Sequence, residues 1–106
     1  MENQNICGLT PIEIEELKEK HGFLILASIT QGENTYHAIF KEPNFNVLES
    51  TRKMSQNNEI KATTALYKNC IVKADEAIST RDYLQLKAAE SIGAHMQSFS
   101  TKVKNL

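Results

Sequence analysis

The stretch from Leu66 to Leu84, LYKNCIVKADEAISTRDYL, decides how the fold of this chain is predicted. Its first part has apolar residues at helical spacing, and the acidic pair that begins at Asp75 follows. Ser79, with Asp82 three residues later, is a typical signal for the start of a helix. The stretch therefore predicts the end of one helix, an acidic turn and the start of another helix. It contains no motif for catalysis or for binding a cofactor.

Toward the C-terminus, an apolar stripe predicts a long last helix over residues 80–104. The residues of the stripe recur at helical spacing and are Leu84, Ala88, Ile92, His95, Met96, Phe99 and Val103. A helix of this length exceeds what so small a body can cover. Its end is therefore expected to project or to contact a partner.

Before this last helix in the chain, two shorter helices are expected, separated by a break at Asn57-Asn58. The first begins after Asn44, with Asn46 and Glu49 as a possible capping pair. Its expected apolar face contains Phe45, Val47, Leu48, Thr51 and Met54. The second runs from Glu59 to about Val72, and its expected buried face contains Ile60, Thr64, Tyr67 and Ile71, with Leu66 and Cys70 alongside. The short connection predicts that these helices are antiparallel neighbours.

The segment before these helices reads as a β-hairpin. Residues 23–30 and 35–41 are rich in strand-forming residues, and the turn Gln31-Gly32-Glu33-Asn34 separates them. Pro43 ends the second strand. One face is expected to contain Phe23, Ile25, Ala27 and Ile29 together with Tyr36, Ala38 and Phe40. We predict that this sheet packs on the last helix through Ile25, Phe40 and Ile92.

A first helix is expected from Pro11 to His21. Thr10 and Glu13 have the spacing of a capping box, and proline fits the first helical position. Gly22 is expected to end the helix, and Ile14 and Leu17 are expected on its buried side. The chain of 106 residues therefore predicts one α+β domain over residues 1–106: an N-terminal helix, a two-stranded antiparallel hairpin, then three helices, the last long. Residues 1–9 are expected to be flexible.

Composition supports a globular protein, with 41% hydrophobic and 24% charged residues. No apolar run of 18 residues occurs, and the first ten residues lack the pattern of a signal peptide. We therefore expect no membrane contact and a protein that stays in the compartment where it is made. Cys7 and Cys70 are far apart and lie in no CxxC motif, which argues against a disulfide framework and a zinc site.

Few residues are candidates for chemistry. His21, His37 and His95 have no metal-binding spacing, and His95 is expected to be a partly buried packing residue. Cys70 is expected to be a buried inert thiol, whereas Cys7 is expected in a mobile terminus with a reactive thiol. The four glycines form no phosphate-binding loop. The sequence thus predicts no enzyme, no catalytic residue, no cofactor and no metal.

Charge is unevenly distributed although the net charge is only −1. Residues 52–73 contain several cations, with Glu59 as the single acid between them. The cations are Arg52, Lys53, Lys61, Lys68 and Lys73. A solvated helical surface explains them, and a nucleic-acid-binding surface is the alternative.

The chain resembles a family of short bacteriophage tail assembly chaperones. In this family an Asn-Cys-apolar stretch precedes an acidic turn, an isoleucine and a helix that opens with an acidic and an aromatic residue. The matching residues here are Asn69, Cys70, Ile71, Val72, Asp75, Glu76, Ile78, Asp82 and Tyr83. The order of elements is also similar, with an Ile-Glu-Glu-Leu-Lys core at Ile14 and a helix with Leu48 and Arg52-Lys53 after Pro43. The chain departs from the family in having Ala74 where a glycine is usual and Ile71 where an aromatic residue is usual.

The resemblance implies a non-enzymatic chaperone in the host bacterial cytoplasm. Such a protein coats the phage tape-measure protein and helps recruit tail-tube subunits, and self-association is a further expectation. The expected partner-binding residues are Met96, Phe99 and Val103, with Phe45 and Met54 second. The alternative is a small phage nucleic-acid-binding or anti-defence protein that uses the basic surface of residues 52–73.

Overall fold

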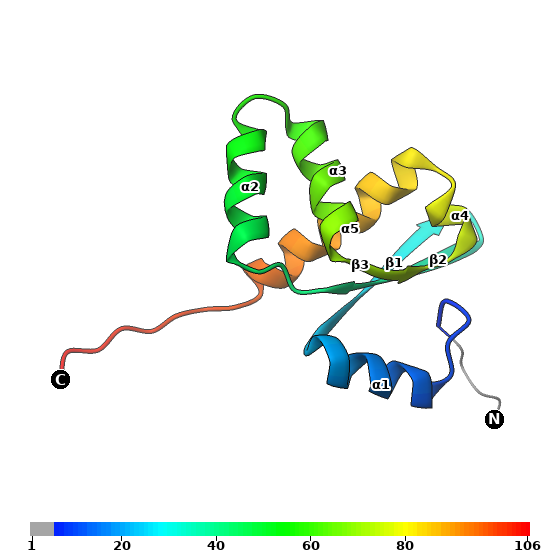
Figure 1. The fold of residues 1–106 in the computed structure, drawn as a ribbon, viewed down its shortest axis with the longest axis horizontal. Helices are drawn as coiled ribbons and strands as arrows, with labels where there is room; N and C mark the ends of the chain where they lie inside the picture. The colour runs from blue at the N-terminus through cyan, green and yellow to red at the C-terminus, as the bar shows by residue number, and fades with distance from the viewer. Residues whose placement is uncertain (1–5) are drawn as a thin grey trace.

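The computed structural model describes residues 6–106, which form an α+β fold with a three-stranded antiparallel sheet. The elements in order are α1 (Pro11–His21), β1 (Leu24–Gln31), β2 (Asn34–Lys41), α2 (Phe45–Ser55), α3 (Glu59–Cys70), β3 (Ile71–Ala74), α4 (Glu76–Ser79) and α5 (Asp82–Gln97). Figure 1 shows α2, α3 and α5 on one side of the sheet and α1 on the other. The predicted fold class is confirmed, although the sheet contains one more strand than expected. Part of the segment expected to be flexible, residues 1–5, lies outside the described residues.

The predicted hairpin is present as β1 and β2. The two strands pair from Leu24 opposite Lys41 to Gln31 opposite Asn34. Gly32 has a φ of +63° at the first position of the two-residue turn. A positive φ at this position is typical of the type II′ turn that glycine favours in hairpins. The expected inward residues Ile25, Ala27, Ala38 and Phe40 are buried, whereas Phe23 is exposed and precedes the strand.

The segment expected to finish the third helix is instead a strand. Helix α3 ends at Cys70, and β3 pairs with β2 through Ala38 opposite Ala74 and Phe40 opposite Ile71. The register shifts between Ile39 and Phe40. Strand β3 gives hydrogen-bond partners to the second side of β2, and its β-branched residues suit an extended backbone. The prediction of helix through Val72 was therefore wrong.

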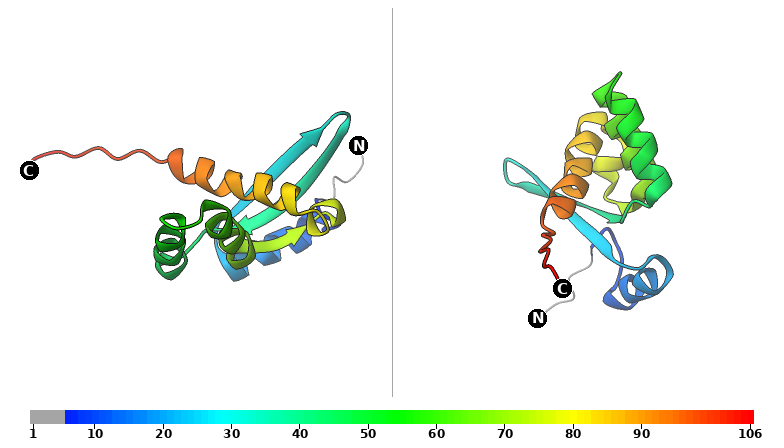
Figure 2. Two further views of the ribbon diagram at one scale, coloured as in Figure 1. Left: turned by 90° about the horizontal axis from the view of Figure 1, so that it is seen from above. Right: turned by 90° about the vertical axis from the view of Figure 1, so that its left-hand side faces the viewer.

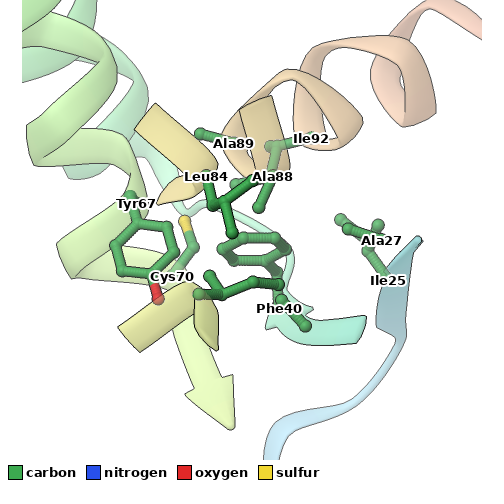
Figure 3. Close-up of a cluster of buried hydrophobic side chains, with 11 residues drawn as sticks. Ile25, Ala27, Phe40, Tyr67, Cys70, Leu84, Ala88, Ala89 and Ile92 are labelled. Atoms are coloured by element: carbon green, nitrogen blue, oxygen red, sulfur yellow. The ribbon is translucent and has the colours of Figure 1, made fainter. Parts of the chain in front are cut away.

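The core lies between the inner face of the sheet and helices α3, α4 and α5. Phe40 is completely buried, and its ring meets that of Tyr67 edge-on with the centroids 5.6 Å apart. Figure 3 shows the side chains that converge there, which are Ile25, Ala27, Phe40, Tyr67, Cys70, Leu84, Ala88, Ala89 and Ile92. The predicted packing of Ile25, Phe40 and Ile92 is confirmed because all three belong to this cluster.

Helices α2 and α3 form the expected antiparallel pair (Figure 1). Asn44, and not Asn46, caps α2 by accepting a hydrogen bond from the Val47 backbone N–H at 2.9 Å. Asn58 caps α3, which confirms the predicted break. The face of α3 differs from the prediction because Ile60 is 65% exposed. Ile60 lies in the first turn of α3, at the end farthest from the sheet (Figure 1).

The predicted apolar face of α2 contains no fully buried residue, since Val47, Leu48 and Thr51 are half-buried and Phe45 and Met54 are exposed. In α3, Tyr67 and Cys70 are buried as predicted, and Ala62 is buried in addition. Leu66 and Ile71 pack against the core and are only partly buried. The α3 face therefore turns toward the sheet mainly in its second half.

The predicted last helix is shorter than expected at both ends, and a separate short helix, α4, precedes it. The short α4 occupies Glu76–Ser79, so Ser79 cannot cap α5, and the N-cap residue Arg81 makes no side-chain capping bond. Helix α5 ends at Gln97, and residues 98–106 form an exposed segment without secondary structure. Helix end segments need packing for stability, and the body of the protein does not extend beyond α5 (Figure 1).

Helix α1 has the predicted bounds. The Thr10 N–H donates to Glu13 Oε1 at 2.9 Å, and the Glu13 N–H donates to Thr10 Oγ1 at 3.2 Å, which completes the capping box. The residue after the helix, Gly22, has a φ of +85°. Ile14 and Leu17 are only half-buried, and no residue of α1 is fully buried. The helix therefore attaches loosely to the outer face of the sheet.

Candidate interaction site

The five residues predicted to bind a partner are all exposed. Their exposed fractions run from 38% for Met96 to 91% for Val103. Phe45 is 88% exposed, although its aromatic side chain would gain most from burial. None of the five contributes to the core cluster, which is how side chains available to a partner are expected to lie.

Three of the five belong to the segments that meet where α2 begins and α5 ends (Figure 1). Glu42, in the link between β2 and α2, accepts a hydrogen bond from His95 Nε2 at 2.6 Å. The ring of Phe99 meets the His95 ring edge-on, with centroids 5.0 Å apart. Phe45 follows Glu42 by three residues, and Met96 follows His95 directly. We call this region, formed by Glu42, Phe45, His95, Met96 and Phe99, the α2–α5 junction.

The structure places the other two predicted residues elsewhere. Met54 lies in the last turn of α2, about 13 Å along the helix axis from Phe45. Val103 lies in the segment 98–106, which we call the C-terminal tail. Figure 2 shows this tail running away from the end of α5 in both views. Met96, Phe99 and Val103, expected on one helix, are thus divided between the end of α5 and the extended tail.

The Glu42–His95 pair is the part of the junction that the sequence did not reveal. His95 is half-buried, as expected of a packing residue, but its hydrogen bond also fixes the last turn of α5 to the link after β2. The two residues are 53 positions apart. No local spacing rule connects residues at that distance, so only the fold brings them together.

The chemistry of the described residues centres on packing. In residues 6–106 no group of three or more His, Cys, Asp and Glu side chains is placed to hold a metal ion. Burial raises the pKa of the Cys70 thiol, which lies in the core with no exposed surface. A thiol in that environment stays protonated and is a poor nucleophile.

Cys7 differs from the prediction of a mobile, reactive thiol. Its side chain is buried, and its Sγ donates to the backbone oxygen of His37 at 3.2 Å. Burial, and secondly the nearby negative charge of Asp75, raise the pKa of Cys7 to about 11. The segment around Cys7 is therefore held against the end of β3 and the middle of β2.

This environment predicts slow thiol labelling at neutral pH. At pH 8 the native protein should react with a disulfide reagent much more slowly than the urea-unfolded protein, because little thiolate forms at Cys7. The difference in labelling between the unchanged protein and Cys7→Ser isolates this thiol. Equal rates in the native and unfolded states would contradict the burial of Cys7.

The raised pKa of Cys7 also gives a pH dependence of stability. The native state holds the proton more tightly than the unfolded state, whose thiol titrates near 9. The contribution of the Cys7 thiol to the free energy of unfolding is therefore fully present below pH 9 and is lost as the pH rises through about 11. Urea midpoints measured from pH 8 to pH 11 should fall, and the fall should be smaller in Cys7→Ser.

The basic residues of the alternative function are all exposed but divided in space. Arg52, Lys53 and Lys61 lie near the loop between α2 and α3, whereas Lys68 and Lys73 lie at the sheet end of α3. Lys53 also forms an ion pair with Glu49, with Nζ and Oε2 3.7 Å apart. Nucleic-acid binding stays a prediction, and steep weakening of binding with added salt would support it.

Comparisons with known proteins do not assign the chain to a family. The chain matches no family model, and no curated protein or solved structure is significantly similar to it. In residues 6–106 no helix combines the length and the apolar character needed to cross a bilayer. The junction and the tail therefore have to be interpreted from their own residues.

Proposed function

We propose that the protein is a non-enzymatic bacteriophage tail assembly chaperone in the host bacterial cytoplasm. In this proposal it binds the tape-measure protein and helps recruit tail-tube subunits. The resemblance of residues 66–84 to that family suggests the function. The observation that carries the proposal is the exposure of Phe45, Met96 and Phe99 where α2 begins and α5 ends, together with that of Val103 and Leu106 further along the tail.

Exposed apolar side chains that lie close together are candidates for contact with a partner. A small protein that places aromatic residues in water commonly has a binding surface there. Phe99 and Val103 are four residues apart, so they would share one face if the tail became helical on binding. A helical client could then pack against the tail and the junction with the spacing typical of helix-in-groove recognition.

The extended tail suits a chaperone that must release its client. Ordering residues 98–106 on binding costs conformational entropy, which lowers the affinity obtained from a given contact area. A chaperone has to leave the finished tail, so a moderate affinity serves the proposed role. The rest of the site is fixed, because Glu42 holds His95 and with it the last turn of α5.

The experiment uses overlapping fragments of the tape-measure protein encoded by the same phage genome. Titration of the purified protein with each fragment in a calorimeter should identify at least one fragment that binds saturably. A fragment of the same composition in scrambled order is the control. The proposal fails if no fragment binds and if co-expression does not keep the full tape-measure protein in solution.

A further inference from the structure

The outer edge of β1 is an unpaired side of the sheet. The strand order is β1-β2-β3, so β1 has a neighbour on one side only. Among residues 6–106 no backbone hydrogen bond outside the β1–β2 ladder involves Leu24–Gln31. Figure 2 shows the tip of the hairpin standing clear of the helices.

The hydrogen bonds of His37 determine which groups of β1 point outward. Its backbone N–H donates to Asp75 Oδ2 at 2.7 Å, and its carbonyl accepts from the Asp75 N–H at 2.9 Å. Both groups of His37 therefore point toward β3, so Ser28, which lies opposite, cannot be hydrogen-bonded to it through the backbone. Because bonded and non-bonded pairs alternate in antiparallel strands, the outward backbone groups belong to Leu24, Leu26, Ser28 and Thr30.

This edge lacks the features that usually protect an edge strand. Natural edges are shortened, bulged, or blocked with charges or proline. The sequence of β1, LILASITQ, is eight residues long and contains no charge, proline or glycine. The opposite edge of the sheet is protected, since β3 has only four residues and contains Lys73. The contrast indicates that the β1 edge is kept open for pairing.

The sequence of β1 is complementary to itself. If a second copy pairs antiparallel about a twofold axis at Ala27, Ala27 faces its own copy and Ile25 faces Ile29. The outward residues then face one another, with Leu26 opposite Ser28 and Leu24 opposite Thr30. Inward apolar residues meet inward apolar residues, which favours the pair. A strand that faces itself must avoid like charges, and β1 has none.

The space beside the edge and its charges are compatible with this pairing. An open hollow of about 430 Å³ lies between residues 28–30 of β1 and one flank of α5. That flank carries Lys87 and Glu90, whose Nζ and Oε1 atoms are 3.4 Å apart. Two such flanks brought together by a twofold axis present one cation and one anion each. Their charges are therefore balanced across the interface.

We propose that the outer edge of β1 pairs antiparallel with the same edge of a second copy, giving a six-stranded sheet in a twofold dimer. The partner is thus this chain itself, joined through backbone hydrogen bonds. The pairing rests on β1 alone and is independent of the proposed client of the tail.

The first test follows amide hydrogen exchange by NMR as the protein concentration rises to about 1 mM, with the mass measured by sedimentation. The dimer should protect the amides of Leu24, Leu26, Ser28 and Thr30 about tenfold or more. The amides of Ile25, Ala27 and Ile29 already bond to β2 in the monomer. Their protection should therefore be the same in the monomer and in the dimer. This alternation is specific to strand pairing.

The second test compares two substitutions of exposed apolar residues by lysine. Leu26→Lys places like charges diagonally across the twofold axis. Each dimer contains two of the new lysines at the paired edge, so the dissociation constant should rise about tenfold or more. Ile12→Lys, on α1 and outside the paired strand, should leave the dissociation constant unchanged. Leu26→Thr, which adds no charge, should keep the dimer. Circular dichroism checks that every variant is folded.

Three results obtained with the purified protein alone would overturn the proposal. They are a monomer at the highest concentration, a dimer whose four outward amides gain no protection, and a dimer that Leu26→Lys does not weaken. Protection of the outward amides only after a tape-measure fragment is added would also overturn it, because the edge would then belong to the client.

Discussion

Phe40→Ala is expected to lower the free energy of unfolding by about 3–5 kcal/mol, which is a large share of the stability of a small domain. Phe40 is completely buried and lies at the centre of the core, where strand β2 meets helices α3 and α5. Its removal leaves a cavity and takes away the edge-on contact with the Tyr67 ring. Urea unfolding followed by circular dichroism measures the change.

Phe45→Ala is the matched control, because it deletes the same atoms from a side chain that is 88% exposed. The free energy of unfolding of this variant should stay within about 0.5 kcal/mol of that of the unchanged protein. Similar losses in the two variants would contradict the placement of Phe40 in the core. A large loss in Phe45→Ala alone would show that the α2–α5 junction is part of the core.

The double substitution Phe99→Asp with Val103→Asp is expected to abolish binding of the tape-measure fragment. Two carboxylates would enter an apolar interface, where an unpaired charge is strongly unfavourable. The melting temperature and the circular dichroism spectrum should remain nearly unchanged, because both side chains are exposed in the described structure. Calorimetric titration with the fragment measures the loss of binding.

A matched control introduces the same charges at other positions of the tail. Ser100→Asp with Thr101→Asp changes the net charge equally but leaves both apolar residues in place. This variant should bind with nearly the original affinity, apart from a long-range effect that salt screens. Equal loss in the two variants would assign the binding to the charge of the tail. Undiminished binding in both would remove the tail from the interface.

The elements that the sequence predicted well are those specified by nearby residues. The capping box between Thr10 and Glu13 and the glycine at position 22 define both ends of α1. The turn at Gly32 defines the hairpin, and Asn58 separates α2 from α3. In each case the hydrogen bonds that decide the boundary join residues no more than a few positions apart. Local patterns are sufficient for such boundaries.

The errors occur where distant residues decide the structure. Apolar residues at helical spacing continue through Ile71 and Val72, but both lie in β3, where Ile71 pairs with Phe40 of β2, some 30 positions earlier in the chain. Likewise the apolar stripe of α5 continues through Val103, but residues 98–106 are exposed, and Phe99 meets the His95 ring in the last turn of the same helix. Periodicity alone does not show whether a partner is present.

The candidate site was predicted in part for the same reason. The sequence showed which apolar residues exceed the needs of a small core, and the five residues chosen are exposed. It could not show that the start of α2, with Phe45, meets the end of α5, with Met96, while Met54 lies at the other end of α2. That grouping depends on the bond between Glu42 and His95.

The position of β3 in the chain has a consequence for synthesis on the ribosome. Strand β2 is complete at Lys41, about 30 residues before β3 begins, and the core also requires Ile92 of the last helix. At about 5–20 residues per second, translation needs several seconds to supply these segments, whereas a hairpin forms in microseconds. A hairpin without its third strand and covering helices is marginal in water. The nascent chain therefore has no stable fold until synthesis has passed Ile92, which completes the core.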